Sequence, residues 1–200
     1  MGADHQFLGT IVLCQIHTDR MVVDGRYETS YLLPVDRLWL TAEGLVGTKG
    51  NDALLHAHHA AHPNKYRPDN TKTFLPNRLL SIGFTGHERL RDERFGPQPM
   101  GIAAEDIIVD CDRRVDLAEL AGGVRIRTAT GPIDLVGAAV AKPCVPFTKH
   151  LLGDQDAPDD VIAPNRAFLG EGMRGYLFGL ANMTDPVSIT SGDEVWAARA

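Results

Sequence analysis

The stretch VRIRTATGPIDLVGAAVAKPCVPFTKHL, residues 124–151, contains the features on which the predicted fold mainly depends. Its segments VRIRT and IDLVGAAVA are rich in apolar and β-branched residues, and the turn signal Gly131–Pro132 separates them, so we expect two consecutive strands. After the second strand, Pro143 and Pro146 flank Cys144, and each proline fixes φ and lacks a backbone N–H donor. The segment PFTKHLLG then predicts a short helix that ends at its glycine.

Further short segments have the same β-type pattern: FLGTIVLCQIH, RLLSIG, DIIVDC, RGYLFGL, VSIT and DEVWAA. The segment TGHERLRDERFG predicts a helix, because Thr85 and Glu88 have capping-box spacing and Gly96–Pro97 is a stop signal. The acidic, proline-containing tract DQDAPDDVIAPN predicts an exposed loop. Many short strands with few helices are typical of a mainly β (α+β) fold, which we expect to be one β-barrel-like domain over residues 1–200.

Composition restricts the classes of function. The net charge of −6 argues against binding to nucleic acid or to an anionic membrane surface. Three cysteines do not make a disulfide framework, so a reducing compartment is expected. The beginning of the chain lacks the pattern of a secretory signal, and no segment has the length of a membrane span. We therefore expect a cytoplasmic protein that binds neither nucleic acid nor a membrane.

Cys144 is the first candidate for chemistry. A thiolate is the reactive and metal-binding form of cysteine, and neighbouring cations stabilise it. Lys142 lies two residues before Cys144, and Lys149 and His150 follow on the predicted helix. The alternative is that Cys144 is a small buried hydrophobe, which is the commoner role of a free cysteine. Cys14 lies within an apolar run, and we expect it to have that packing role.

A histidine-rich segment, HAHHAAHP, is the second candidate. If NDALLHAHHAAH is a helix with Asn51 as its N-cap, His58 and His62 lie four residues apart on one face, a spacing that can bind zinc. No glutamate stands between them, so the metalloprotease pattern with its general base is absent. A solvated polar helix face explains the same residues, and a zinc hydrolase therefore stays an alternative.

Basic residues form the third candidate. Lys65 and Arg67 lie in HPNKYRPDN, and Arg174 lies in GEGMRGYLFG, whose glycines would let the backbone approach a ligand. The planar guanidinium group of arginine suits a phosphate or a carboxylate. Turn glycines and a surface arginine explain the same pattern without a ligand. The phosphate-binding glycine loops and the G-x-S-x-G nucleophile motif are absent from the sequence.

Several short motifs follow one another in a specific order. They are the Leu120–Gly123 spacing after a strand, Pro143–Cys144, Arg174–Gly175, and GDEV at 192–195 opening the last strand. In this order they resemble the MOSC domain, the module named after the C-terminal part of molybdenum-cofactor sulfurases. The segments LLPVDRLWLTAEGLVG and NRLLSIGFTGHERL are similar to the first half of that module, so the resemblance covers nearly the whole chain.

The resemblance implies a closed β-barrel whose cysteine carries sulfur or binds a molybdenum cofactor (molybdopterin). In that family the cysteine of the Pro-Cys pair is the proposed carrier or metal ligand, and by position this is Cys144. With Cys144, we expect Lys142, Arg174, Lys49 and Arg67 to bind the cofactor. Binding of pyridoxal phosphate follows only by association with the family, and the expected partner is a redox or sulfur-donor protein.

The implied activity is that of a molybdenum-dependent oxidoreductase or a sulfur transferase. Two alternatives stay open beside it. One is a non-catalytic β-barrel that binds a small anionic ligand or a partner protein. The other is the zinc hydrolase of the histidine-rich segment.

Overall fold

The computed structural model describes residues 5–41, 44–50, 55–56, 80–181 and 186–199. The largest sheet of the described residues has the order β14-β10-β11-β12-β8-β9-β1-β4. Its strands are β14 (Glu194–Ala198), β10 (Val124–Thr128), β11 (Gly131–Val140), β12 (Tyr176–Leu180), β8 (Leu80–Phe84), β9 (Ile107–Asp110), β1 (His5–His17) and β4 (Leu32–Pro34). The predicted strands are thus confirmed, with ends that differ by a few residues.

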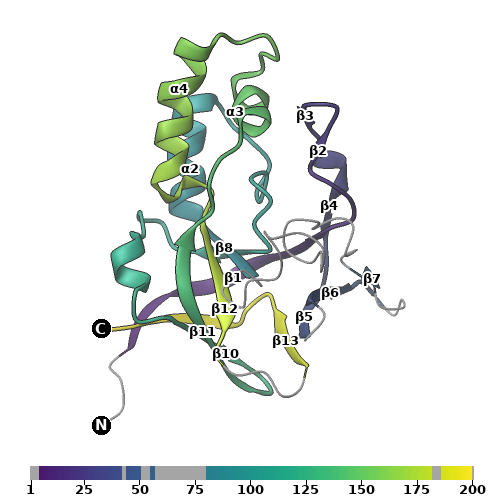
Figure 1. Cartoon of the computed structure of the whole chain (residues 1–200). Coiled ribbons are helices and arrows are strands. Elements are labelled where there is room, and N and C mark those ends of the chain that lie inside the picture. The colour runs from purple at the N-terminus through teal and green to yellow at the C-terminus, as the bar shows by residue number, and fades with distance from the viewer. Residues whose placement is uncertain (1–4, 42–43, 51–54, 57–79, 182–185, 200) are drawn as a thin grey trace.

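Strand β1 closes this sheet into a barrel (Figure 1). It runs over 13 residues, and its first half pairs with β14 while its middle pairs with β9. Since β14 pairs with β10 on its other side, seven strands form a closed ring, and β4 continues beside the end of β1. Gly9 lies at an irregularity of the β1–β14 register, where any side chain would overlap the carbonyl group of Asp110.

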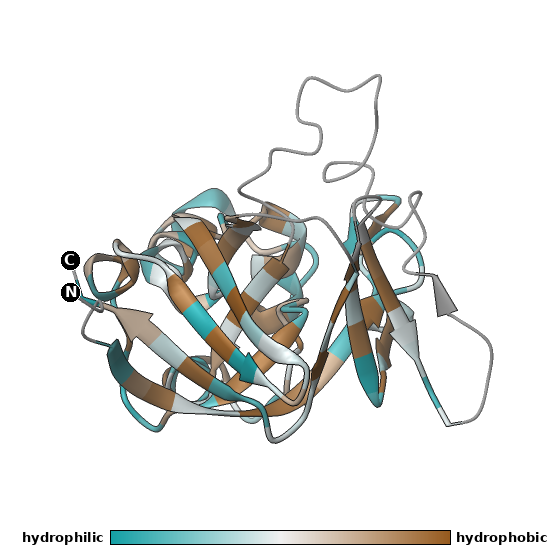
Figure 2. Ribbon diagram, turned by 90° about the horizontal axis from the view of Figure 1, so that it is seen from below, coloured by the Kyte–Doolittle hydropathy of each residue, from teal (hydrophilic) through white to brown (hydrophobic). Residues whose placement is uncertain are grey.

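The barrel interior is the main hydrophobic core. Strand β8 is buried along its whole length, whereas β10 and β14 alternate between buried residues and residues that are at least partly exposed. Figure 2 shows the resulting alternation of apolar and polar residues along the barrel strands. Because one face of such a strand contacts the core and the other contacts water, the period-two pattern of the sequence is what specifies the barrel.

Two smaller sheets accompany the barrel. One has the order β13-β5-β6-β7, and the other is the hairpin β2–β3. Their strands are β13 (Val187–Thr190), β5 (Arg37–Thr41), β6 (Gly44–Thr48), β7 (Leu55–His56), β2 (Val22–Val23) and β3 (Arg26–Tyr27). Asp24 and Gly25 join β2 to β3 with positive φ angles of 48° and 78°, as in the tight two-residue turns that favour an Asp-Gly pair.

Three α-helices gather at one end of the barrel, beside the hairpin (Figure 1). They are α2 (Thr85–Phe95), α3 (Val145–Leu152) and α4 (Asp159–Phe168), and the short helical turns are η1 (Thr29–Tyr31), η2 (Leu117–Leu120) and the π-type turn η3 (Leu169–Met173). A second hydrophobic cluster lies among these helices. It contains Tyr27, Ile102, Ala103, Ala104, Phe147, Leu151, Leu169 and Met173. None of the helices of the described residues has the length and apolar character to cross a membrane.

Two local predictions are wrong. The tract 154–165, predicted as an exposed loop, is a loop only up to residue 158, and from Asp159 it forms α4. This helix buries Ile162 and places Asp159 and Asp160 in its first turn, where the helix dipole stabilises negative charge. The capping box at Thr85 is absent, because the N-cap residue is Phe84. The hydroxyl group of Thr85 instead accepts a hydrogen bond of 2.9 Å from the backbone N–H of Cys111.

Candidate functional site

Cys144 lies at the junction between the barrel and the helical end. It follows β11 and is the N-cap residue of α3, and Pro146 stands in the first turn of that helix. Cys144 is half-buried, whereas Cys14 is 1% exposed and Cys111 is 7% exposed. Cys144 is therefore only partly buried, packed against the second hydrophobic cluster, whereas Cys14 has the packing role expected for it.

Arg174 brackets Cys144. One terminal nitrogen of its guanidinium group donates a hydrogen bond of 2.8 Å to the carbonyl oxygen of Lys142, and the guanidinium carbon lies 4.8 Å from the centre of the Phe147 ring. Lys142 precedes Cys144 by two residues and Phe147 follows it by three. The guanidinium group thus spans the segment that contains the cysteine, and this brings together two of the predicted site residues.

Tyr27 lies at the same place. Its ring centre is 4.9 Å from that of Phe147 and 5.4 Å from that of His150. Burial raises the pKa of the Tyr27 phenol, the positive charge of Arg174 lowers it, and the negative charges of Glu105 and the Cys144 thiolate raise it. Arg174, Glu105 and Cys144 therefore all lie close enough to this hydroxyl group to influence it.

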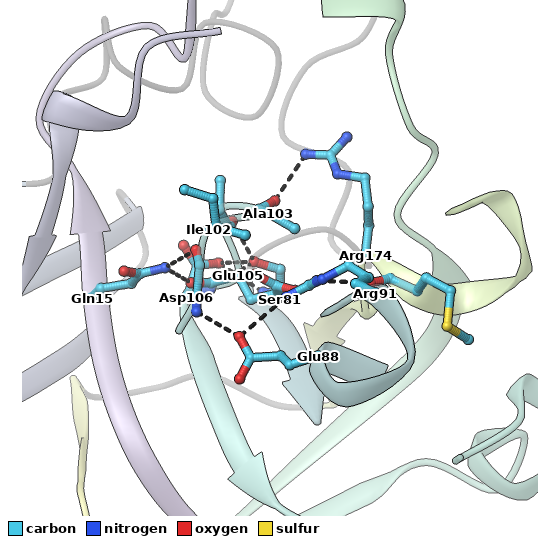
Figure 3. Close-up of polar contacts among 12 residues, drawn as sticks. Gln15, Ser81, Glu88, Arg91, Ile102, Ala103, Glu105, Asp106 and Arg174 are labelled. Carbon is cyan, nitrogen blue, oxygen red and sulfur yellow. Dashed lines mark hydrogen bonds and ion pairs between the residues drawn. The ribbon is translucent and has the colours of Figure 1, made fainter. Parts of the chain in front are cut away.

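The loop 101–105 contacts Arg174 as well, and side chains from several elements hold its carbonyl oxygens (Figure 3). Gln15 donates to Gly101 and Glu105, Tyr27 donates to Ile102, Arg174 donates to Ala103, and His17 bonds to Ala104, at distances between 2.6 and 3.0 Å. Ala104 has a φ angle of 65°, which L-residues rarely adopt. A strained turn at this position persists because so many partners fix it.

A buried ion-pair network supports that loop. Arg91 and Glu105 are each 1% exposed and lie 2.7 Å apart, and Arg91 also contacts Glu88 at 3.1 Å. Burial raises the pKa of Glu88 to about 7. Sequence analysis missed this network, although Glu88 and Arg91 have the three-residue spacing of a helical ion pair. The composition of α2 is polar, and no local pattern in the sequence shows that Glu105 covers Arg91.

The structure describes two of the three remaining residues that were predicted to bind the cofactor, Lys142 and Lys49. Lys142 is exposed, and it is its carbonyl oxygen that contacts Arg174. Lys49 is exposed at the end of β6 in the second sheet, next to the turn in which Gly50 donates to Asp36. Arg67 lies outside the described residues.

The proposed zinc ligands His58 and His62 also lie outside the described residues. Leu55–His56 form a strand, β7, so the predicted helix is wrong at these two residues. Within the described ranges, no group of three histidine, cysteine, aspartate or glutamate side chains is placed to hold a metal ion.

Two glycines near Arg174 serve internal packing. A side chain at Gly175 would overlap the carbonyl group of Ile82, and one at Gly172 would overlap the hydroxyl group of Tyr176. Both glycines have positive φ angles, of 74° and 90°. They let the chain turn sharply out of η3, and this turn directs Arg174 toward the loop 101–105.

Comparisons with known proteins agree on the fold. No family model and no curated protein matches the sequence. Among solved structures, YuaD from Bacillus subtilis superposes with a TM-score of 0.55 at 15% identity, over 98% of this chain and 97% of its own. A protein described as hypothetical superposes with a TM-score of 0.53 at 15% identity, over 98% of this chain and 73% of its own. YiiM from Escherichia coli gives 0.50 at 16% identity, over 84% and 66%. The chain has the predicted MOSC-like β-barrel fold.

Proposed function

We propose that the Cys144 end of the barrel is a ligand site, and that the sulfur atom of Cys144 either binds the molybdenum of a molybdopterin cofactor or carries a transferable sulfur atom. The observation that supports this proposal most is the bracketing of Cys144 by Arg174. Arg174 bonds to the carbonyl oxygen of Lys142 and lies over the ring of Phe147, so a permanent positive charge lies against the segment that contains the half-buried cysteine. A cation near a cysteine favours its thiolate form. The resemblance to MOSC domains selects the same cysteine.

The residues at this end fit an anionic ligand that contains a soft metal. Cys144 supplies a soft sulfur donor. The Nε atom of Arg174 is buried and has no hydrogen-bond partner within the described part of the chain, so a donor remains for a phosphate or pterin oxygen. Lys142 adds an exposed positive charge nearby. When bound, the cofactor would supply redox chemistry at molybdenum, while this chain would hold it and exclude water.

In the sulfur-carrier version, a donor persulfide supplies the sulfur atom. The Cys144 thiolate attacks the terminal sulfur of the donor, a new S–S bond forms, and the donor thiolate leaves. Arg174 stabilises the attacking thiolate. The donor is the partner protein in this version. Binding of pyridoxal phosphate is not part of the proposal.

The experiment is purification after co-expression with the enzymes that make the cofactor, followed by assays of molybdenum and pterin. Wild type is expected to retain both, Cys144→Ser to lose molybdenum, and Cys111→Ala, a cysteine variant away from the site, to behave as wild type. Wild type and Cys144→Ser both empty would exclude the cofactor version. A persulfide found on Cys144 after incubation with a sulfane donor supports the carrier version, and its absence excludes that version.

A non-catalytic barrel that binds a small anion is the second candidate, because the remaining donor of Arg174 and the charge of Lys142 would serve it without the thiol. Inorganic phosphate would then raise the melting temperature of wild type and of Cys144→Ser equally, and would not raise that of Arg174→Met.

A further inference from the structure

The buried side chain of Arg91 binds both the residue before Arg174 and the loop that Arg174 contacts. Arg91, on α2, donates hydrogen bonds of 2.7 Å to the Glu105 carboxylate and 2.8 Å to the carbonyl oxygen of Met173. Met173 is the residue immediately before Arg174, and Glu105 belongs to the loop whose Ala103 carbonyl accepts from Arg174. Arg91 therefore fixes both the backbone from which Arg174 projects and the loop that Arg174 reaches (Figure 3).

Glu88 completes this arrangement from the same helix. Its carboxylate accepts 3.1 Å from Arg91 and 2.6 Å from the backbone N–H of Gly101, the first residue of the loop 101–105. A buried guanidinium group is costly unless it is paired, and a charged acceptor makes such hydrogen bonds stronger. The two hydrogen bonds that Glu88 accepts are therefore stronger when its carboxylate is ionised than when it is neutral.

Glu88 is also the member of this network that solvent reaches. It is 12% exposed and lines a surface hollow of about 530 Å³ together with Thr85, Arg89, Asp92, Glu93, Gln98 and Met100. Burial, Glu105 and Asp92 raise the pKa of Glu88, while the Gly101 N–H and Arg91 lower it, and the result is about 7. These are the groups that face the carboxylate from its own helix and from the loop.

We propose that Glu88, Arg91 and Glu105 are positioning residues that hold Arg174 against the Cys144 segment, and that proton uptake at Glu88 through the hollow weakens this hold. The inference rests on the proposed function for the importance of the Arg174–Cys144 pair. The proposal can be tested separately from the proposed function, because it concerns the reactivity of Cys144 in the protein without any cofactor. A loosened Arg174 spends less time near the thiol group and stabilises the thiolate less.

The test is the rate at which iodoacetamide alkylates Cys144, measured by mass spectrometry of its peptide from about pH 5.5 to about pH 8.5, the range in which Glu88 changes charge. Glu88→Gln removes the titration but keeps an oxygen that can accept from Gly101. Glu93→Gln is the matched control, since Glu93 is exposed on the same helix and lines the same hollow. Melting temperatures establish that each variant is folded.

The expected ratio of the wild-type rate to the Glu88→Gln rate is near one at the low end and rises to about threefold or more at the high end, which corresponds to a coupling within the range measured for residues of one network. Glu93→Gln follows wild type throughout. Arg91→Lys, which keeps the charge but not the fork that reaches two acceptors, is slow at high pH.

A ratio that does not change with pH, or a Glu93→Gln variant that shifts as much as Glu88→Gln, would overturn the proposal. The outcome is independent of the molybdenum and pterin assays. The network could position Arg174 even if the protein binds no cofactor, and the protein could bind the cofactor without the network. The two experiments therefore distinguish failure of this proposal from failure of the proposed function.

Discussion

The guanidinium carbon of Arg174 lies 4.8 Å from the centre of the Phe147 ring, three residues beyond Cys144. The arginine comes from the turn after η3 and the ring from α3, so two separate elements meet next to the segment that contains the cysteine. A cation over an aromatic face is attracted by the ring, and here the same cation also bonds to Lys142 and Ala103. Three contacts therefore determine the position of Arg174. The outcomes expected for the cysteines, the two glycines, His87 and Glu88 do not depend on that position.

The first prediction concerns the number of reactive thiol groups. Cys14 and Cys111 are buried, and burial together with Asp193 raises the pKa of Cys14 to about 12. Titration of the folded protein with a disulfide reagent should therefore modify one cysteine rapidly, and all three only in denaturant. Cys144→Ser should remove the rapid phase. A rapid phase that survives in this variant would show that a buried cysteine is accessible.

The second prediction compares two glycines with positive φ angles. Gly175 and Gly153 have φ angles of 74° and 66°, but only Gly175 contacts another part of the chain, at Ile82. Gly153→Ala should lower the free energy of unfolding by about 1 kcal/mol, from backbone strain alone. Gly175→Ala should lower it by about 3 kcal/mol or more, because a clash adds to the strain. Urea unfolding measures both values, and equal losses would contradict the packing at Ile82.

The third prediction is a loss of stability in acid that depends on His87. Burial lowers the pKa of His87 from 6.5 to about 4, and its ring nitrogen accepts from the Val115 N–H at 3.0 Å. Between the two pKa values, 6.5 and about 4, the unfolded chain binds a proton that the folded chain does not. The free energy of unfolding therefore falls as the pH falls. The full contribution is roughly 3 kcal/mol. His87→Gln should have a shallower stability profile between these pH values, and a profile as steep as that of wild type would contradict the assignment.

The fourth prediction has the opposite sign and concerns Glu88. Its pKa is raised from 4.5 to about 7, so between these values the folded chain binds the extra proton and stability falls as the pH rises. Relative to wild type, Glu88→Gln should gain up to roughly 3 kcal/mol as the pH rises through this interval. Denaturant unfolding at several pH values measures the difference. A gain that appears on acidification instead would mean that the ionised carboxylate stabilises the fold.

The sequence predicts the barrel well because its strands carry their own signal. VRIRT coincides with β10 in the barrel, and VSIT coincides with β13 in the second sheet. The segment that forms α4 looks like a loop in the sequence because it contains acidic residues and Pro164. The burial of Ile162 depends instead on contacts with distant parts of the chain. Local patterns describe one segment at a time and do not contain such contacts.

Local sequence patterns likewise predict one part of the candidate site and not the other. Cys144 stood out through its flanking prolines and the family resemblance, and Arg174 through its glycine-rich setting. Arg91 and Glu105 did not, since each looks like an ordinary surface residue until the loop 101–105 folds over α2. The family resemblance predicts Lys49 at the site, but Lys49 follows β6 in the second sheet, and no sequence pattern shows where that sheet lies.

The most direct test of the central claim, that Arg174 activates Cys144, is the alkylation rate of Cys144 near neutral pH in wild type and Arg174→Met. Arg166→Met removes the same charge from an exposed position on α4 and is the matched control. The account predicts a rate about threefold or more lower in Arg174→Met, because the nearby cation that stabilises the thiolate is lost, and a wild-type rate in Arg166→Met. Equal rates in wild type and a folded Arg174→Met variant would contradict it.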